Sequence, residues 1–142
     1  MSVLDLSALR NAIASLDGAL AVTGDSAWFE AQSPAVRDTL IAGVVQNFEF
    51  VYELGMKMLR RQLELGADSP AEVDRSNFRD VLRVAGEKGL VEDVEAWFRP
   101  RTMRNISTHT YDQVKARMVY ADARAPLNDA RALLAALEAC DG

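Results

Sequence analysis

The chain has 142 residues, a formal net charge of −5, 49% hydrophobic and 26% charged residues, and one cysteine. This length suits a single domain over residues 1–142, and the composition is too apolar for a disordered chain. No stretch approaches the roughly 20 apolar residues that cross a bilayer, and we expect no signal peptide because the N-terminus lacks the basic and apolar regions of one. Cys140 alone cannot form an internal disulfide, which fits a reducing compartment, so we expect a cytoplasmic protein without a membrane partner.

Apolar residues recur with the helical period from almost the first residue, which predicts a helix over about residues 4–22. Its apolar stripe consists of Leu6, Leu9, Ile13, Leu16 and Leu20. Residues 25–33 are expected to form a loop, with Trp28 and Phe29 packed back against the bundle.

A long second helix is predicted to start at Ser33-Pro34, a hydroxyl N-cap followed by proline at the first helical position, and to end near Gly66. Its apolar stripe runs through Leu40 or Ile41, Val44, Phe48, Val51 or Tyr52, Gly55, Met58 or Leu59, and Leu63. A helix of this length, roughly 45 Å at 1.5 Å per residue, needs packing partners along its whole length.

The second half of the chain is also helical in pattern. Residues 67–77 are expected to be a polar linker, followed by a helix over residues 78–87 that stops at Gly89. A further helix from about residue 91 contains Pro100, which should kink or split it around Arg99, and a last helical stretch over residues 111–139 contains Pro126. The sequence therefore predicts an all-α fold, an antiparallel bundle of four to six helices.

Residues 101–112 carry the most informative chemistry. They contain His109, the only histidine of the chain, and the region from Ala96 to Tyr111 has three arginines and no acidic residue. An imidazole can move a proton near neutral pH, and a guanidinium can hold a phosphate through two parallel hydrogen bonds. In an acidic protein, this pattern indicates a phosphate-handling site.

Geometry leaves two interpretations of the histidine open. Asn105 and His109 share a helical face, but Arg104 lies about 140° from His109 on a straight helix. Arg104 and His109 converge only if the helix loosens near His109 or the arginine side chain swings across. The alternative is a histidine that caps or packs against a helix end.

Glu49 and Glu53 lie one turn apart on the long helix, with Lys57 one turn further. Two such carboxylates could bind a metal or relay protons, but no histidine lies nearby, and Glu53 and Lys57 are spaced for a helical ion pair. We favour the structural interpretation, in which one glutamate orients Arg101 or Arg104 from across the bundle. We therefore expect no metal and no cofactor.

Other classes of site have no signal in the sequence. It contains no glycine-rich phosphate loop, nucleophile elbow or cluster of cysteine and histidine. The aromatic residues Trp28, Phe29, Trp97 and Phe98 are interpreted as core. The net negative charge argues against broad duplex binding, so DNA is not an expected partner.

The string Arg104-Asn105-Ile-Ser-Thr-His109 resembles the R-N-x-x-x-H motif of the HEPN superfamily. With Tyr111 it becomes R-x4-H-x-Y, similar to the branch encoded beside a minimal nucleotidyltransferase and also called nucleotidyltransferase substrate-binding proteins. Residues 46–54 with Lys57, residues 76–90, and Trp97 also fit, so the resemblance covers about residues 35–127. Pro100, and Met103 in place of a common acidic residue, depart from the family pattern.

This resemblance implies a homodimer that brings two motifs into one cleft and acts as a metal-independent endoribonuclease on RNA. His109 would transfer protons, Arg104 would stabilise charge on the phosphate, and Asn105 would hold the imidazole or a phosphate oxygen. It also implies a minimal nucleotidyltransferase antitoxin that transfers AMP to Tyr111, a residue whose type alone favours a packing role. The alternative function is a non-catalytic substrate-binding subunit of a nucleotidyltransferase complex.

Overall fold

The computed structural model describes residues 4–107 and 112–140, apart from the side chains of Asp74 and Ser107. Within these residues the chain forms eight α-helices, one 3₁₀ helix and no strand, which confirms the predicted all-α bundle. The helix count exceeds the predicted range because several short helices occur between the long ones. In chain order the elements are α1 (Ser7–Gly24), α2 (Ser26–Glu30), α3 (Pro34–Leu65), α4 (Pro70–Arg75), α5 (Phe78–Glu87), η1 (Glu95–Trp97), α6 (Phe98–Ser107), α7 (Gln113–Ala121) and α8 (Arg124–Ala139).

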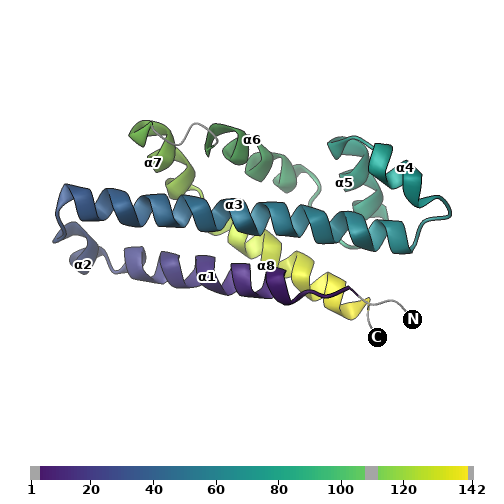
Figure 1. Cartoon of the computed structure of the whole chain (residues 1–142), viewed down its shortest axis with the longest axis horizontal. Coiled ribbons are helices and arrows are strands. Elements are labelled where there is room, and N and C mark those ends of the chain that lie inside the picture. The colour runs from purple at the N-terminus through teal and green to yellow at the C-terminus, as the bar shows by residue number, and fades with distance from the viewer. Residues whose placement is uncertain (1–3, 108–111, 141–142) are drawn as a thin grey trace.

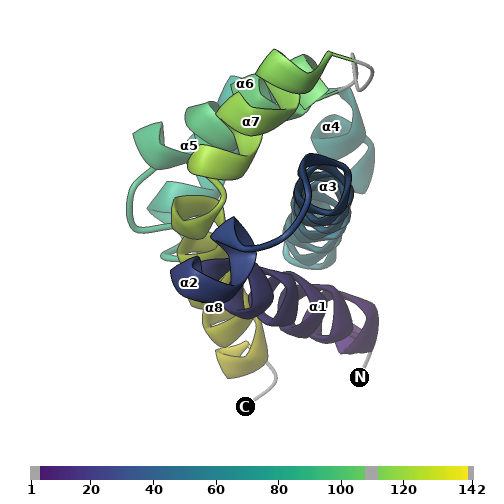
Figure 2. The ribbon, with the colours of Figure 1, turned by 90° about the vertical axis from the view of Figure 1, so that its left-hand side faces the viewer.

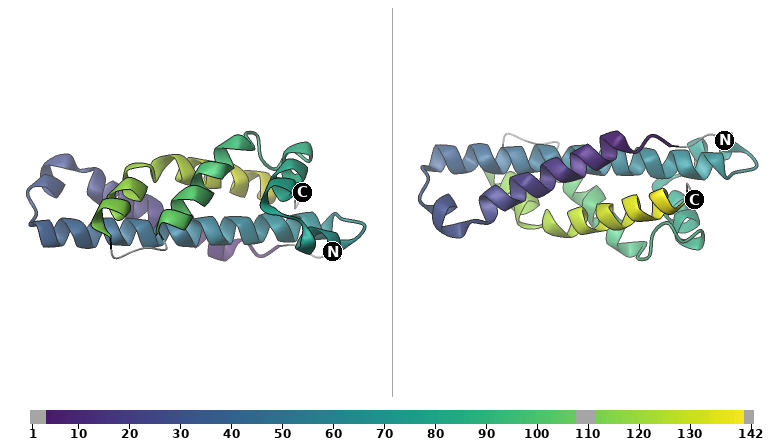
Figure 3. Two further views of the ribbon diagram at one scale, coloured as in Figure 1. Left: turned by 90° about the horizontal axis from the view of Figure 1, so that it is seen from above. Right: turned by 90° about the horizontal axis from the view of Figure 1, so that it is seen from below.

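Helix α3 runs the length of the molecule, and the other helices lie along it (Figure 1). Helices α1 and α8 cover one side, while α5, α6 and α7 cover another (Figure 2). In the view from below, α1 crosses α3 and α8 lies beside it, and in the view from above, α6 and α7 extend from α3 to one side (Figure 3). The side chains of Arg10 and Glu138, 3.9 Å apart, link the start of α1 to the end of α8. No helix of the described part of the chain combines the length and apolarity needed to cross a membrane.

Helix α1 follows the predicted stripe, since all five apolar residues predicted for it are buried. The predicted loop after it is wrong in part, because residues 26–30 form the single-turn helix α2. The carboxylate of Asp25 accepts a hydrogen bond from the amide of Trp28 at 3.2 Å and so caps this turn. Phe29 packs inward against the ring of Tyr120, but Trp28 is 43% exposed, so the prediction that both aromatic residues are buried holds only for Phe29.

Helix α3 has the predicted ends. The hydroxyl of Ser33 accepts a hydrogen bond from the amide of Val36, Pro34 occupies the first helical position, and Gly66 follows the last residue. Its predicted stripe is buried, including Phe48 and Leu59, which are fully enclosed. The local signals at the two ends and the apolar stripe were therefore sufficient to predict this helix.

The region predicted as a polar linker contains α4, because Ser69-Pro70 starts one short helix. Arg60 of α3 donates hydrogen bonds to the backbone carbonyls of Val73 and Ser76 and so satisfies acceptors at the end of that helix. Helix α5 has the predicted bounds and ends before Gly89, whose φ of 77° is the left-handed conformation that favours glycine.

The motif helix begins later than predicted. The carboxylate of Asp93 accepts a hydrogen bond from the amide of Ala96, and the chain then enters η1 and α6. Pro100 lies in the first turn of α6, where its missing N–H costs no intrahelical bond, so it does not kink the helix.

The last predicted helix is two helices, α7 and α8, which are separated at residues 122–123. Pro126 lies in the first turn of α8, so it belongs to a helix start and not to an internal kink.

Two helical glycines give a test of this packing. A Cβ on Gly55 would meet Leu133 at 3.7 Å and Trp97 at 3.8 Å, which is ordinary contact, whereas a Cβ on Gly86 would meet Val94 at 2.7 Å. We expect Gly55→Ala to stabilise the fold by about 0.5–1 kcal/mol, because alanine is the better helix former. Gly86→Ala should destabilise it by about 1–3 kcal/mol, because the stiff valine cannot move aside cheaply. Urea denaturation of both variants measures the difference, and equal stabilities would contradict this packing.

Candidate functional site

The site is built around an ion pair between α6 and α3. Nη2 of Arg104, in the last turn of α6, lies 3.1 Å from Oε1 of Glu53, near the middle of α3. The two side chains are 40% and 50% exposed, so water reaches both. Glu53 therefore orients Arg104 from across the bundle, as one of the two sequence alternatives predicts.

Glu49 lies one turn before Glu53 on α3 and is partly exposed. Within the described residues, no group of three or more histidine, cysteine, aspartate or glutamate side chains is placed to hold a metal ion. The metal interpretation of Glu49 and Glu53 therefore gains no support, while the role of Glu53 beside Arg104 does.

Tyr52 lies beside this ion pair and is half-buried. Burial raises the pKa of its hydroxyl, and the positive charges of Arg101, Arg104 and Arg60 act in the opposite direction. The hydroxyl therefore stays protonated at neutral pH.

The other two arginines of the basic run have different surroundings. The guanidinium of Arg101 lies over the ring of Phe78, 4.4 Å from its centroid, and does not pair with Glu53. Arg99 lies 2.5 Å from the carboxylate of Asp122 and so ties α6 to the junction between α7 and α8. Sequence reasoning grouped these arginines by proximity along the chain and could not see Phe78 or Asp122 as their partners.

The remaining predicted site residues are less fully placed. Asn105 is exposed in the last turn of α6, next to Arg104. His109 and Tyr111 lie outside the described residues, so their predicted roles remain predictions. Met103, one of the two departures from the family pattern, is buried in the core and anchors α6 to it.

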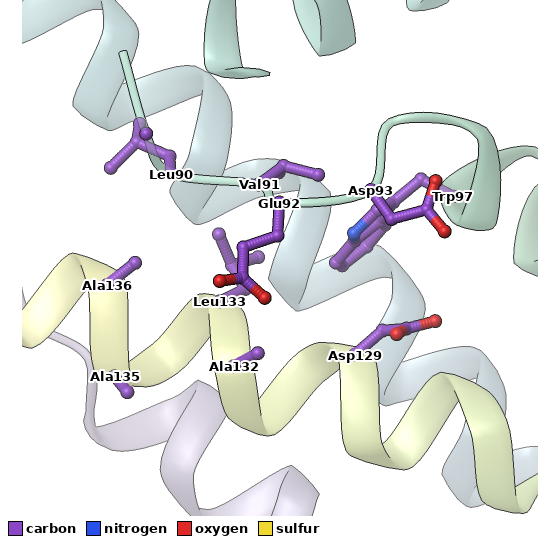
Figure 4. A pocket seen from close by; sticks show the side chains of 11 residues that line it. Leu90, Val91, Glu92, Asp93, Trp97, Asp129, Ala132, Leu133, Ala135 and Ala136 are labelled. Carbon is purple, nitrogen blue, oxygen red and sulfur yellow. The ribbon is translucent and has the colours of Figure 1, made fainter. Parts of the chain in front are cut away.

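The structure also contains a pocket that the sequence did not predict. A cavity of about 380 Å³ lies between residues 89–93 and the outer face of α8. Figure 4 shows the side chains of Glu92, Asp93 and Asp129 around it, with Trp97 as one wall. Burial, and then repulsion from Asp93, raises the pKa of Asp129. None of the predicted site residues lines this acidic pocket, so it is distinct from the Arg104–Glu53 site.

Comparison with known proteins agrees with this architecture. Residues 4–139 match the family model for proteins described as nucleotidyltransferase substrate binding protein like. The chain is 47% identical over 118 residues to a protein of Haemophilus influenzae named "Probable ribonuclease HepT", with 83% of this chain and 81% of that protein covered.

The fold is also known from a solved structure. HI0074 from Haemophilus influenzae, described as having the fold of a substrate binding domain of a nucleotidyltransferase, superposes with a TM-score of 0.91 at 43% identity. The match covers 94% of this chain and 99% of that one. The all-helical bundle with its arginine-bearing motif helix is thus that of a nucleotidyltransferase substrate-binding protein of the HEPN type. The chain belongs to this family.

Proposed function

We propose that this protein is a metal-independent endoribonuclease of the HEPN toxin type, neutralised by a minimal nucleotidyltransferase antitoxin. The observation that carries the proposal is Arg104, held by Glu53 on a rigid helix at the start of the R-x4-H string that ends in His109. The relative named as a probable ribonuclease supports the same reaction class.

The proposed reaction is an internal transesterification of RNA. A 2′-oxygen attacks the adjacent phosphorus, the bond from phosphorus to the 5′-oxygen breaks, and a 2′,3′-cyclic phosphate and a 5′-hydroxyl result. His109 accepts the proton of the 2′-hydroxyl or supplies one to the leaving 5′-oxygen. In a dimer, the second histidine takes the other of these two roles. Arg104 stabilises negative charge on the non-bridging oxygens, and Asn105 holds the imidazole or a phosphate oxygen.

Glu53 acts as a positioning residue in this scheme. An exposed ion pair contributes only about 0–1 kcal/mol, so a phosphate can replace the carboxylate at small cost. A guanidinium that donates two parallel hydrogen bonds to a phosphate gains more than it loses. Glu53 therefore keeps Arg104 oriented before RNA arrives without blocking its binding.

The alternative is a non-catalytic subunit that shapes the substrate site of a nucleotidyltransferase. The description of HI0074 as a substrate binding domain favours it. Both functions require the same partner. They differ in whether the chain alone cleaves RNA.

We expect His109→Ala and Arg104→Ala each to abolish RNA cleavage by the purified protein, and toxicity on expression, with little loss of stability. Arg104 is 40% exposed and its ion pair with Glu53 is open to water, so its removal should cost little stability. Cleavage is measured on a labelled RNA, and stability by thermal melting.

Two controls make this test specific. Arg83→Ala removes an exposed arginine whose partner is Glu87 on the same helix, and it should leave cleavage unchanged. Activity that stops when a chelator is added would instead favour metal chemistry at Glu49 and Glu53. A wild-type chain that cleaves no RNA would favour the non-catalytic subunit.

We also propose a homodimer. Three large apolar side chains on α3 and α7, Phe50, Val114 and Met118, are 48%, 66% and 52% exposed, and their burial in a second copy of the chain would stabilise a dimer. Light scattering should give twice the monomer mass at micromolar concentration, with an interface above about 1,000 Å². Met118→Glu should weaken the dimer, whereas Leu65→Glu at the far end of α3 should not. A monomer at that concentration would contradict the proposal.

The off-switch is proposed to be AMP on Tyr111. An added phosphate two residues from His109 would compete for Arg104 and occupy the cleft. Incubation with the cognate nucleotidyltransferase, ATP and magnesium should add the mass of AMP to a peptide that contains Tyr111, and Tyr111→Phe should abolish the addition. AMP found on Tyr52 or Tyr120 instead would show that the switch lies elsewhere.

A further inference from the structure

We propose that four side chains at the edge of α5 and α6 form a binding site for the backbone of single-stranded RNA, next to Arg104. They are Arg79 and Phe78 from α5 and Phe98 and Arg101 from α6, and we call them the arginine–phenylalanine ladder. The inference rests on the proposed function, since it assigns the path that the substrate takes to the site.

The ladder is defined by three contacts in series. The guanidinium of Arg101 lies 4.4 Å from the ring centroid of Phe78, which meets Phe98 edge to face at 5.3 Å, and the guanidinium of Arg79 lies 4.6 Å from the ring of Phe98. Both phenylalanines are held by the core or packed against it. Two exposed guanidinium groups are thus each held over a ring, which reduces the side-chain entropy lost when they bind a ligand.

The guanidinium groups of Arg79 and Arg101 remain available to bind a phosphate. Among the side chains that the structure describes, neither Arg79 nor Arg101 has a carboxylate within 4.0 Å. By contrast, Arg83 pairs with Glu87, Arg99 pairs with Asp122, and Arg117 pairs with Asp38. A guanidinium stacked on a ring keeps its N–H edge free for the bidentate hydrogen bonds that a phosphate accepts.

The ladder lies next to Arg104, the arginine of the proposed catalytic site. Arg101 and Arg104 are one turn apart on α6, and both act on the hydroxyl of Tyr52. The order Arg79, Arg101, Arg104 therefore forms a row of positive charge on a chain of net charge −5. A single strand has one phosphate per nucleotide at regular intervals, so a row of guanidinium groups can contact successive phosphates. An acidic protein segment would match it less well, because carboxylates do not recur at a fixed spacing.

Direct measurement of binding tests this assignment. The probe is a short 2′-O-methyl RNA, which the protein cannot cleave by the proposed reaction because the methylated oxygen cannot attack. Each phosphate contact to a single strand contributes about 0.7 to the slope of log affinity against log salt concentration. We expect Arg79→Gln and Arg101→Gln each to lower that slope by about 0.7 and to weaken binding by roughly tenfold at low salt.

Two further variants separate a positioned guanidinium from general charge. Arg83→Gln removes the same charge one turn away on α5, where Glu87 already pairs with it, so it should change the slope far less. Arg79→Lys keeps the charge but loses the planar stacking and the bidentate edge, so it should retain the slope and still weaken binding. Thermal melting of each variant shows that the fold is intact.

The outcomes are distinct. Equal slopes for Arg79→Gln and Arg83→Gln, or wild-type affinity for Arg79→Lys, would overturn the ladder even if the wild-type protein cleaves RNA. Loss of nucleotidyltransferase binding with unchanged RNA binding would overturn it in favour of a protein-docking surface. A ladder-dependent slope in a protein that cleaves no RNA would sustain the RNA-binding site and reject the ribonuclease.

Discussion

The structure depends on the burial of one continuous apolar stripe along α3. A single helix of 32 residues gains most of its stability from packing and not from intrinsic propensity, so it persists because the other helices pack along its length. Its buried residues run from Ile41 to Leu63, and α1 and α8 lie on one side of it while α6 and α7 lie on another. Glu53 projects from this rigid helix toward α6, which is why a single carboxylate can orient Arg104.

The core and the site are coupled through the start of the motif helix. Trp97, which is 5% exposed, lies beside Gly55 of α3, and a Cβ at that position would be in ordinary contact with the indole at 3.8 Å. Met103, also buried, continues this anchor one and a half turns further along. Arg101 lies between these two residues and packs over Phe78. Arg104 follows Met103 and pairs with Glu53. Arginine positions set by buried neighbours on the same helix need little reordering when a ligand binds.

The sequence predicted those features that local signals decide. The ends of α3 follow from Ser33-Pro34 and Gly66, the end of α5 follows from Gly89, and the buried stripes follow from periodicity. The short helices α2 and α4 were missed, because each depends on a single start signal that also fits a turn. Contacts between distant segments were the hardest to predict. The sequence predicted that a glutamate pairs with Arg101 or Arg104 but did not decide between them. The structure decides, because Arg101 packs over the ring of Phe78 while Arg104 pairs with Glu53.

The proposed catalysis and its proposed inhibition both depend on the weakness of one ion pair. Because Arg104 and Glu53 are exposed to water, their attraction is small and any anion with better geometry can displace the carboxylate. In the proposed function, an RNA phosphate bound next to Arg79 and Arg101 can displace the carboxylate in this way. The phosphate of an AMP group on Tyr111 can do the same. A buried pair would hold the arginine more firmly, but replacing its carboxylate with a phosphate would then require desolvating a second anion in the core. An exposed pair is therefore the arrangement that allows one guanidinium to serve both as a binding group for substrate and as the group that a modified tyrosine blocks.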